Sequence, residues 1–169
     1  MMNKKFVSVL ACLFIFISVA LVFGQYRPSM FSRQDKIQAP DFSLKDIYGK
    51  TFRLSSQRGN PVIMFFGSTW CSVCRSEMPN YKYLYDKYAR RGLKFLYIDV
   101  NEPPERVARF AKQNSFPYLV LVDEYGSVAE DYNLIGVPTL FLLDKERNIV
   151  DVTHQIADLN LEKIFPAKK

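Results

Sequence analysis

The chain has 169 residues, of which 49% are hydrophobic and 24% are charged, a composition that excludes a disordered or fibrous protein. Its net charge of +6 is spread along the sequence rather than gathered in one patch, so a nucleic-acid-binding surface is not expected. Once residues 1–36 are set aside, the remainder is long enough to bury one hydrophobic core as a compact monomer.

An uncharged apolar segment, residues 6–24, opens the chain. As a helix it would be about 28 Å long, close to the roughly 30 Å of a bilayer's hydrocarbon core. Lys4 and Lys5 precede it, which favours a cytoplasmic N-terminus and an exported remainder. Gly24 is a small residue at which a signal peptide could be cleaved, so a cleaved signal peptide is the alternative. The apolar run, however, is longer than the about 7 to 15 residues usual in the core of a signal peptide. We expect residues 1–24 to be the membrane anchor of an extracytoplasmic domain, with residues 6–24 as its one transmembrane helix.

The anchor is followed by a polar stretch without periodicity, residues 25–36, which indicates a linker to a folded domain at 37–169. The domain begins with two short strand candidates, residues 41–44 and 51–54. Gly49 lies between them and fits the turn of a hairpin. We therefore expect an N-terminal β-hairpin extension before the main body of the domain.

Short apolar runs rich in β-branched and aromatic residues follow, and such runs are typical of strands buried on both faces of a sheet. They cover residues 62–66, 95–100, 119–122, 140–143 and, as a last and less apolar strand, 149–153. Helical patterns separate these strands. The alternation predicts an α/β fold with a mixed central sheet flanked by helices.

Apolar residues at helical spacing mark three segments of the domain. The first pattern recurs every three or four residues at Met78, Tyr81, Tyr85 and Tyr88. We expect this helix to end at Gly92 and to pack its aromatic stripe on the sheet rather than to present it as a binding surface. A second helix is expected from Pro104, and a closing helix at residues 157–165.

Two cysteines separated by two residues stand between the first buried strand and the first helix, in Trp70-Cys71-Ser72-Val73-Cys74. In the first helical turn, unsatisfied backbone N–H groups and the helix dipole favour the thiolate of Cys71, which makes it the expected nucleophile. Cys74 lies about one turn further on the same face, close enough to form a disulfide with Cys71 and too far inward to meet a substrate first. Cys74 is the expected resolving thiol.

The expected cycle has two exchanges. The Cys71 thiolate attacks a substrate disulfide, and Cys74 then attacks the Cys71 sulfur and releases the reduced substrate. Zinc is not expected, because Cys71, Cys74 and His154 supply too few ligands in the exported part. A purely structural bridge over so short a loop would stabilise the fold very little. A redox-active disulfide, with no metal or other cofactor, is therefore the preferred interpretation.

The sequence resembles the membrane-anchored, thioredoxin-like thiol–disulfide oxidoreductases of the ResA and TlpA type, which are related to the AhpC/TSA redoxins. The resemblance covers about residues 39–150. It rests on Ala39-Pro40-Asp41-Phe42, Gly49-Lys50, Phe65-Phe66-Gly67-Ser68-Thr69-Trp70-Cys71, the Cys-x-x-Cys motif, Glu77-Met78-Pro79 and Gly136-Val137-Pro138-Thr139-Leu140-Phe141. It implies a thioredoxin-like fold for the domain.

The resemblance also implies a substrate-binding region. It makes Pro138 a cis proline beside the reactive sulfur and gives the backbone of Val137 the role of pairing with substrate, with Trp70 as a neighbouring contact. The position of Pro138 before an apolar strand tolerates a cis turn, although a strand-entry proline without a chemical role is the alternative.

Glu77, three residues after Cys74, matches an acid that this family places near the cysteine pair. It could take or give a proton, and the alternative is a surface glutamate favoured by the helix N-terminus. Phe65 stands where cytoplasmic thioredoxins carry a buried aspartate, which leaves Glu77 the better candidate for proton handling.

The resemblance implies reduction of exported protein disulfides, often in the haem-binding motifs of apocytochromes c, with electrons from a membrane thiol carrier. Ser72 and Val73 include no cationic residue that would strongly stabilise the Cys71 thiolate, which favours a reductant. An oxidase or isomerase function remains an alternative, because the direction of exchange depends on the reduction potential of the cysteine pair relative to its partners. So does a Sco-type copper chaperone with His154 as ligand, although that pattern separates its cysteines by three residues, and a lone histidine is usually an ordinary surface residue.

Overall fold

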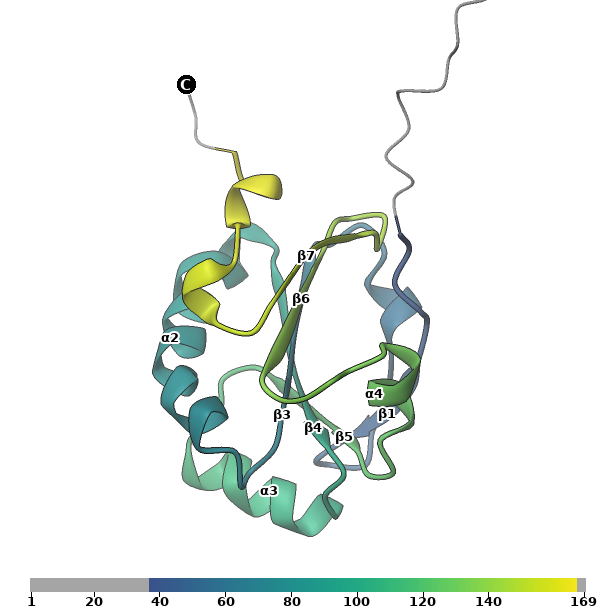
Figure 1. Ribbon diagram of the computed structural model, residues 1–169, viewed down its shortest axis with the longest axis vertical. Helices are drawn as coiled ribbons and strands as arrows, with labels where there is room; N and C mark the ends of the chain where they lie inside the picture. Colours follow the sequence, from purple (N-terminus) through teal and green to yellow (C-terminus); the bar gives the residue numbers. More distant parts are fainter. Residues whose placement is uncertain (1–36, 167–169) are drawn as a thin grey trace, which may run out of the picture. The chain divides into compact units, whose positions relative to one another are not determined.

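The computed structural model describes residues 37–166 (Figure 1). The predicted anchor and linker lie outside these residues, and within them no helix has the length and apolar character needed to cross a bilayer. One mixed sheet carries the strands in the order β2-β1-β5-β4-β3-β6-β7. The strands are β1 (Ser43–Asp46), β2 (Thr51–Arg53), β3 (Val62–Gly67), β4 (Lys94–Val100), β5 (Leu119–Asp123), β6 (Thr139–Leu143) and β7 (Ile149–Thr153).

The three central strands β3, β4 and β5 are parallel, and the outer strands are antiparallel to their neighbours. The sheet is therefore mixed, as predicted. The α-helices are α2 (Ser72–Tyr88), α3 (Pro104–Gln113) and the short α4 (Ser127–Asp131), which the sequence did not predict. Figure 1 shows α2 and α3 on one face of the sheet and α4 on the other.

Strand β3 explains why the core has two layers. All its residues are buried, and alternate side chains point to opposite faces. Phe65 packs under α2 and α3, whereas Phe66 packs on the face of α4. Tyr81 of α2 is 1% exposed, lies 5.2 Å from the Phe65 ring between centroids, and donates to the carbonyl of Leu96 at 3.0 Å. The tyrosine stripe of α2 thus packs on the sheet, as predicted.

The predicted N-terminal strands lie at the sheet's edge. β1 pairs antiparallel with β2, and Gly49 in the turn between them has a φ of 83°, a left-handed conformation that favours glycine. β1 also pairs with β5, so this segment is part of the main sheet and begins two residues later than predicted.

The helix that follows β3 ends close to the predicted position. Helix α2 ends at Tyr88, and a 3₁₀ turn, η2 (Ala89–Arg91), leads from it to Gly92.

The predicted closing helix at residues 157–165 is wrong. The chain forms two separate 3₁₀ turns, η3 (Ile156–Asp158) and η4 (Leu161–Lys163). Between them, the carboxylate of Asp151 accepts a hydrogen bond from the N–H of Asn160 at 2.8 Å. The side chain of Asn160 accepts one from the N–H of Glu162 at 3.1 Å. These side-chain acceptors take the N–H groups that a continuous helix would pair with its own carbonyls.

Candidate active site

Cys71 is the N-cap residue of α2. Its backbone is extended, with φ −72° and ψ 112°, and its sulfur accepts a hydrogen bond from the N–H of Cys74 at 3.1 Å. The two cysteines form a disulfide with their Cα atoms 5.2 Å apart. Cys71 is 6% exposed, and Cys74 is fully buried. The first turn of α2 therefore presents a donor to the sulfur that solvent can reach, which would stabilise a thiolate there after reduction.

The loop before β6 lies against the reactive sulfur. The Val137–Pro138 peptide bond is cis, Pro138 is buried, and the carbonyl oxygen of Val137 lies 3.8 Å from the Sγ of Cys71. Trp70, one residue before Cys71, is 65% exposed. The structure thus brings the cysteine pair and the predicted substrate-binding residues together at one end of the sheet.

Two shallow hollows flank this loop. One, of about 260 Å³, lies between Trp70 and Ile135, and the other, of about 370 Å³, lies between Val73 and His154. Both share Ile135 and Val137 in their lining. Ile135 is fully exposed and Val73 is half-exposed, so the rim around Cys71 is apolar. An apolar rim of this kind fits a protein segment better than a small charged molecule.

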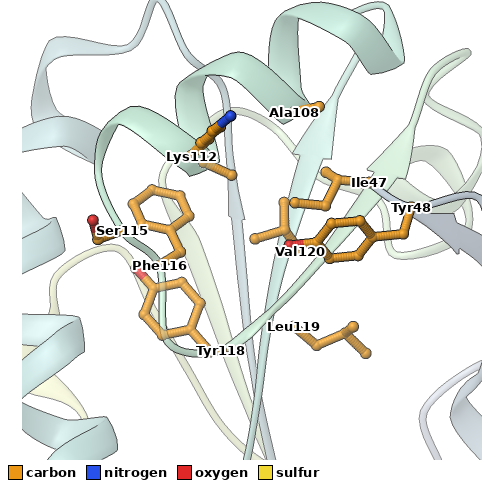
Figure 2. A pocket seen from close by; sticks show the side chains of 10 residues that line it. Ile47, Tyr48, Ala108, Lys112, Ser115, Phe116, Tyr118, Leu119 and Val120 are labelled. Carbon is orange, nitrogen blue, oxygen red and sulfur yellow. The ribbon is translucent and has the colours of Figure 1, made fainter.

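A third hollow, of about 440 Å³, lies elsewhere on the domain (Figure 2). It lies between α3, β5 and the turn after β1, and Ile47, Tyr48 and Phe116 line it with Lys112 at its edge. None of its lining residues belongs to the two hollows beside the cysteines. It is therefore separate from the exchange site.

Glu77 occupies the position expected from its spacing, half-buried one turn beyond Cys74. Its Oε2 accepts a hydrogen bond from the N–H of Ile156 at 3.3 Å, which links α2 to the 3₁₀ turn η3. The structure thus gives this carboxylate a role in holding the segment after β7. Proton handling by Glu77 stays a prediction.

His154 is exposed and supports the cis-proline loop. Its Nδ1 lies 2.9 Å from the carbonyl oxygen of Pro138 and 3.2 Å from the Oγ1 of Thr139. The Thr139 hydroxyl donates to the carbonyl of Gly136 at 2.7 Å, so Nδ1 must carry the proton that it shares with both neighbours. Within residues 37–166, no three His, Cys, Asp or Glu side chains are grouped as metal ligands. Nothing in the sequence indicated that His154 contacts the loop that carries Pro138.

Glu102, which the sequence analysis missed, holds the loop that carries Cys71. It is 3% exposed, and its Oε2 accepts from the N–H of Thr69 at 2.5 Å. Its Oε1 accepts from the Thr69 hydroxyl at 2.7 Å and from Arg106 at 3.3 Å. Both oxygens of one buried carboxylate thus fix a residue two positions before the nucleophile.

Asp99, on β4, was missed as well, although an acid within the apolar run of residues 95–100 was a signal that could have found it. It is fully buried, and neither carboxyl oxygen makes a well-formed hydrogen bond within the described part of the chain. Burial, and then the negative charge of Glu102, raise the pKa of Asp99 from 3.8 to about 8. Asp99 is therefore mostly protonated at neutral pH.

The sheet, the cysteine pair at a helix N-terminus and the cis proline beside it define a thioredoxin-like thiol–disulfide oxidoreductase. The model of the AhpC/TSA family matches residues 36–152, and the chain belongs to this family. It is 30% identical over 174 residues to the thiol–disulfide oxidoreductase ResA of Bacillus cereus, covering 98% of this chain and 100% of that protein.

Two further proteins show the same similarity. The ResA of Geobacillus kaustophilus is 35% identical over 133 residues, which cover 76% of each chain. The crystal structure of a thiol:disulfide interchange protein of the thioredoxin family from Chlorobium tepidum is 30% identical, with a TM-score of 0.65. That match covers 72% of this chain and 88% of the other. The chain is therefore a thiol–disulfide oxidoreductase of the ResA type.

Proposed function

We propose that this protein reduces disulfides in extracytoplasmic proteins through Cys71 and Cys74. In each turnover the substrate disulfide gains two electrons and two protons and leaves as two thiols, and the Cys71–Cys74 dithiol becomes the disulfide. The two cysteines are the redox centre, and no metal or other cofactor takes part. A membrane thiol carrier restores the dithiol, and apocytochromes c, with paired cysteines in their haem-binding motifs, are the proposed substrate class.

The geometry around Cys71 carries this proposal. The reachable sulfur faces the N–H of Cys74 and the Val137 carbonyl, while the Cys74 sulfur is fully buried behind it. A substrate sulfur can therefore meet Cys71 alone. The apolar rim of Trp70, Val73 and Ile135 offers a protein segment a surface beside it.

The reductase direction rests on what lies between the cysteines. Ser72 and Val73 are uncharged, so the residues between the cysteines add no cation to the support that the helix N-terminus gives the Cys71 thiolate. We expect a midpoint potential of about −230 mV or lower in thiol buffers of known potential. Val73→His is the matched variant, because a cation beside the thiolate stabilises the reduced form and should raise the potential. A wild-type potential near about −120 mV would contradict the proposal and indicate an oxidase.

The membrane location rests on the uncharged segment at residues 6–24 and on Lys4 and Lys5 before it. Protease added to intact spheroplasts should digest the domain of the full-length protein. A chain that lacks residues 1–24 serves as the control, since it should stay in the cytoplasm and be cleaved only after lysis. Protection of the full-length domain in intact spheroplasts would refute the extracytoplasmic assignment.

A further inference from the structure

Hydrogen bonds connect the loop between β3 and α2 to the end of β4 and to the residues that follow it. The Ser68 hydroxyl donates to the Val100 carbonyl at 3.1 Å, and Thr69 donates twice to Glu102. Asn101 has a φ of 59°, a left-handed conformation that asparagine tolerates, and it turns the chain between β4 and Glu102. The position of Cys71 therefore depends on the carboxylate of Glu102.

Asp99 lies next to this attachment. It pairs with Gly67 in the parallel register of β3 and β4, and it shares a face of β4 with Tyr97, which packs in the same core cluster as both cysteines. A Cβ at Gly67 would lie 2.8 Å from the Tyr97 hydroxyl, so glycine is needed where the loop begins. The fully buried Asp99 carboxyl thus lies beneath the active-site loop, near Glu102 and the Tyr97 hydroxyl.

We propose that Asp99 and Glu102 act as a coupled pair of positioning residues, in which Glu102 fixes Thr69 and the protonation state of Asp99 tunes the reactivity of Cys71. The inference rests on the proposed exchange at Cys71 and deepens it. Neither carboxyl touches the reacting sulfurs. Both act through the loop and through their charge.

The coupling follows from electrostatics in a buried site. While Asp99 is protonated, the pair carries one negative charge, and Arg106 at 3.3 Å from Glu102 offsets part of it. When Asp99 ionises, a second buried negative charge appears on the face of the sheet that carries the cysteines. This charge disfavours the Cys71 thiolate, and by reciprocity a thiolate at Cys71 disfavours ionisation of Asp99.

The charged and titratable groups around Asp99 come from three parts of the fold. Tyr97 belongs to β4, Glu102 follows β4, and Arg106 belongs to α3; each of them affects the pKa of Asp99. Tyr118, directly before β5, is among the groups that raise the pKa of Tyr97. Burial and Glu102 raise the pKa of Asp99 to about 8, while Arg106 and Tyr97 lower it. The switch between the two states of the pair therefore falls near pH 8.

The test is the pH dependence of alkylation of Cys71 in the reduced full-length protein. Iodoacetamide is the probe, and mass spectrometry of the peptide that contains Cys71 separates it from other thiols. In the wild type the rate should rise with pH and then lag above about pH 8, where Asp99 ionises in the reduced protein. Asp99→Asn should remove the lag and react about two- to fivefold faster above that pH, with little change below it.

Glu102→Gln tests the other half of the pair. The amide oxygen can still accept from the Thr69 N–H, and the amide NH₂ can donate to the Thr69 hydroxyl, so this variant removes the charge of Glu102 and keeps the contacts with Thr69. With one buried negative charge fewer, alkylation should be faster below the lag. With the charge of Glu102 gone, the lag should also move to lower pH. Glu105→Gln removes an exposed charge three residues away, and Asp123→Asn removes a buried carboxyl on β5 whose oxygens hold α4. Both controls should keep the wild-type lag.

Superimposable profiles of wild type and Asp99→Asn between pH 6 and 10 would overturn the inference. Should a variant fail to fold, carbon NMR of the Asp99 carboxyl in the wild type decides instead. Its titration should move to higher pH when the disulfide is reduced, and an unchanged titration would overturn the inference. Neither measurement uses a protein substrate, so both outcomes are independent of whether the protein reduces or oxidises its partners.

Discussion

Replacing Cys74 with serine should stop the cycle at the mixed disulfide and abolish turnover, a loss of at least about 10³-fold in disulfide reduction. Cys71 keeps its place at the N-terminus of α2, where a donor N–H faces its sulfur, so it still attacks. The buried thiol that would attack the Cys71 sulfur is missing. Substrate proteins should therefore accumulate as covalent adducts on Cys71.

Non-reducing electrophoresis of cells that carry Cys74→Ser should show these adducts, and their removal by a reductant would establish that they are disulfides. Cys71→Ser is the matched control and should give none. A Cys12→Ser background excludes adducts through the third cysteine of the chain. Adducts that persist in Cys71→Ser but are absent from Cys74→Ser would mean that the two roles are reversed. Mass spectrometry of the trapped proteins would identify the substrate.

Asp99→Asn should stabilise the protein at alkaline pH, by on the order of 2 kcal/mol in the free energy of unfolding at about pH 8. The pKa of Asp99 is about 8 in the folded protein, against 3.8 as the ordinary value. The folded state therefore binds more protons between these values, and the contribution of Asp99 is fully present below about pH 4 and is lost as pH rises to about 8. The amide carries no ionisable proton, although it is itself buried and poorly paired, which limits the gain.

Urea unfolding followed by circular dichroism at pH 5 and pH 8 measures this effect. The difference between the variant and the wild type should be larger at pH 8 than at pH 5. Asp123→Asn is the control with the opposite sign, because the Asp123 carboxylate accepts from the N–H of Ala129 at 2.9 Å and from Ser127 at 3.3 Å. That variant should be less stable at both pH values. A gain from Asp99→Asn that is equal at both pH values would contradict a titrating Asp99.

The parts of the fold that depend on local patterns were predictable from the sequence. Buried strands have a continuous apolar run, and the first helix has a repeat of aromatic residues, so β3 and α2 follow from residue spacing. The helix-terminal position of Cys71 follows from the same spacing. The prediction of a closing helix was wrong because backbone N–H groups of that segment pair with the side chains of Asp151 and Asn160. Residue periodicity does not reveal such contacts.

The supports of the site come from long-range contacts. Thr69 and Glu102 are 33 residues apart, and His154 reaches the carbonyl of Pro138 across 16. Neither contact can be predicted from the sequence alone, because each one depends on which strands are neighbours in the sheet and on the register of their pairing. Local sequence thus determined the chemistry of the cysteine pair, since a thiol at a helix N-terminus needs only its own helix. The pairing of β3 with β4 decided which buried acids lie beneath it, since the charge felt at Cys71 depends on distance in space and on burial.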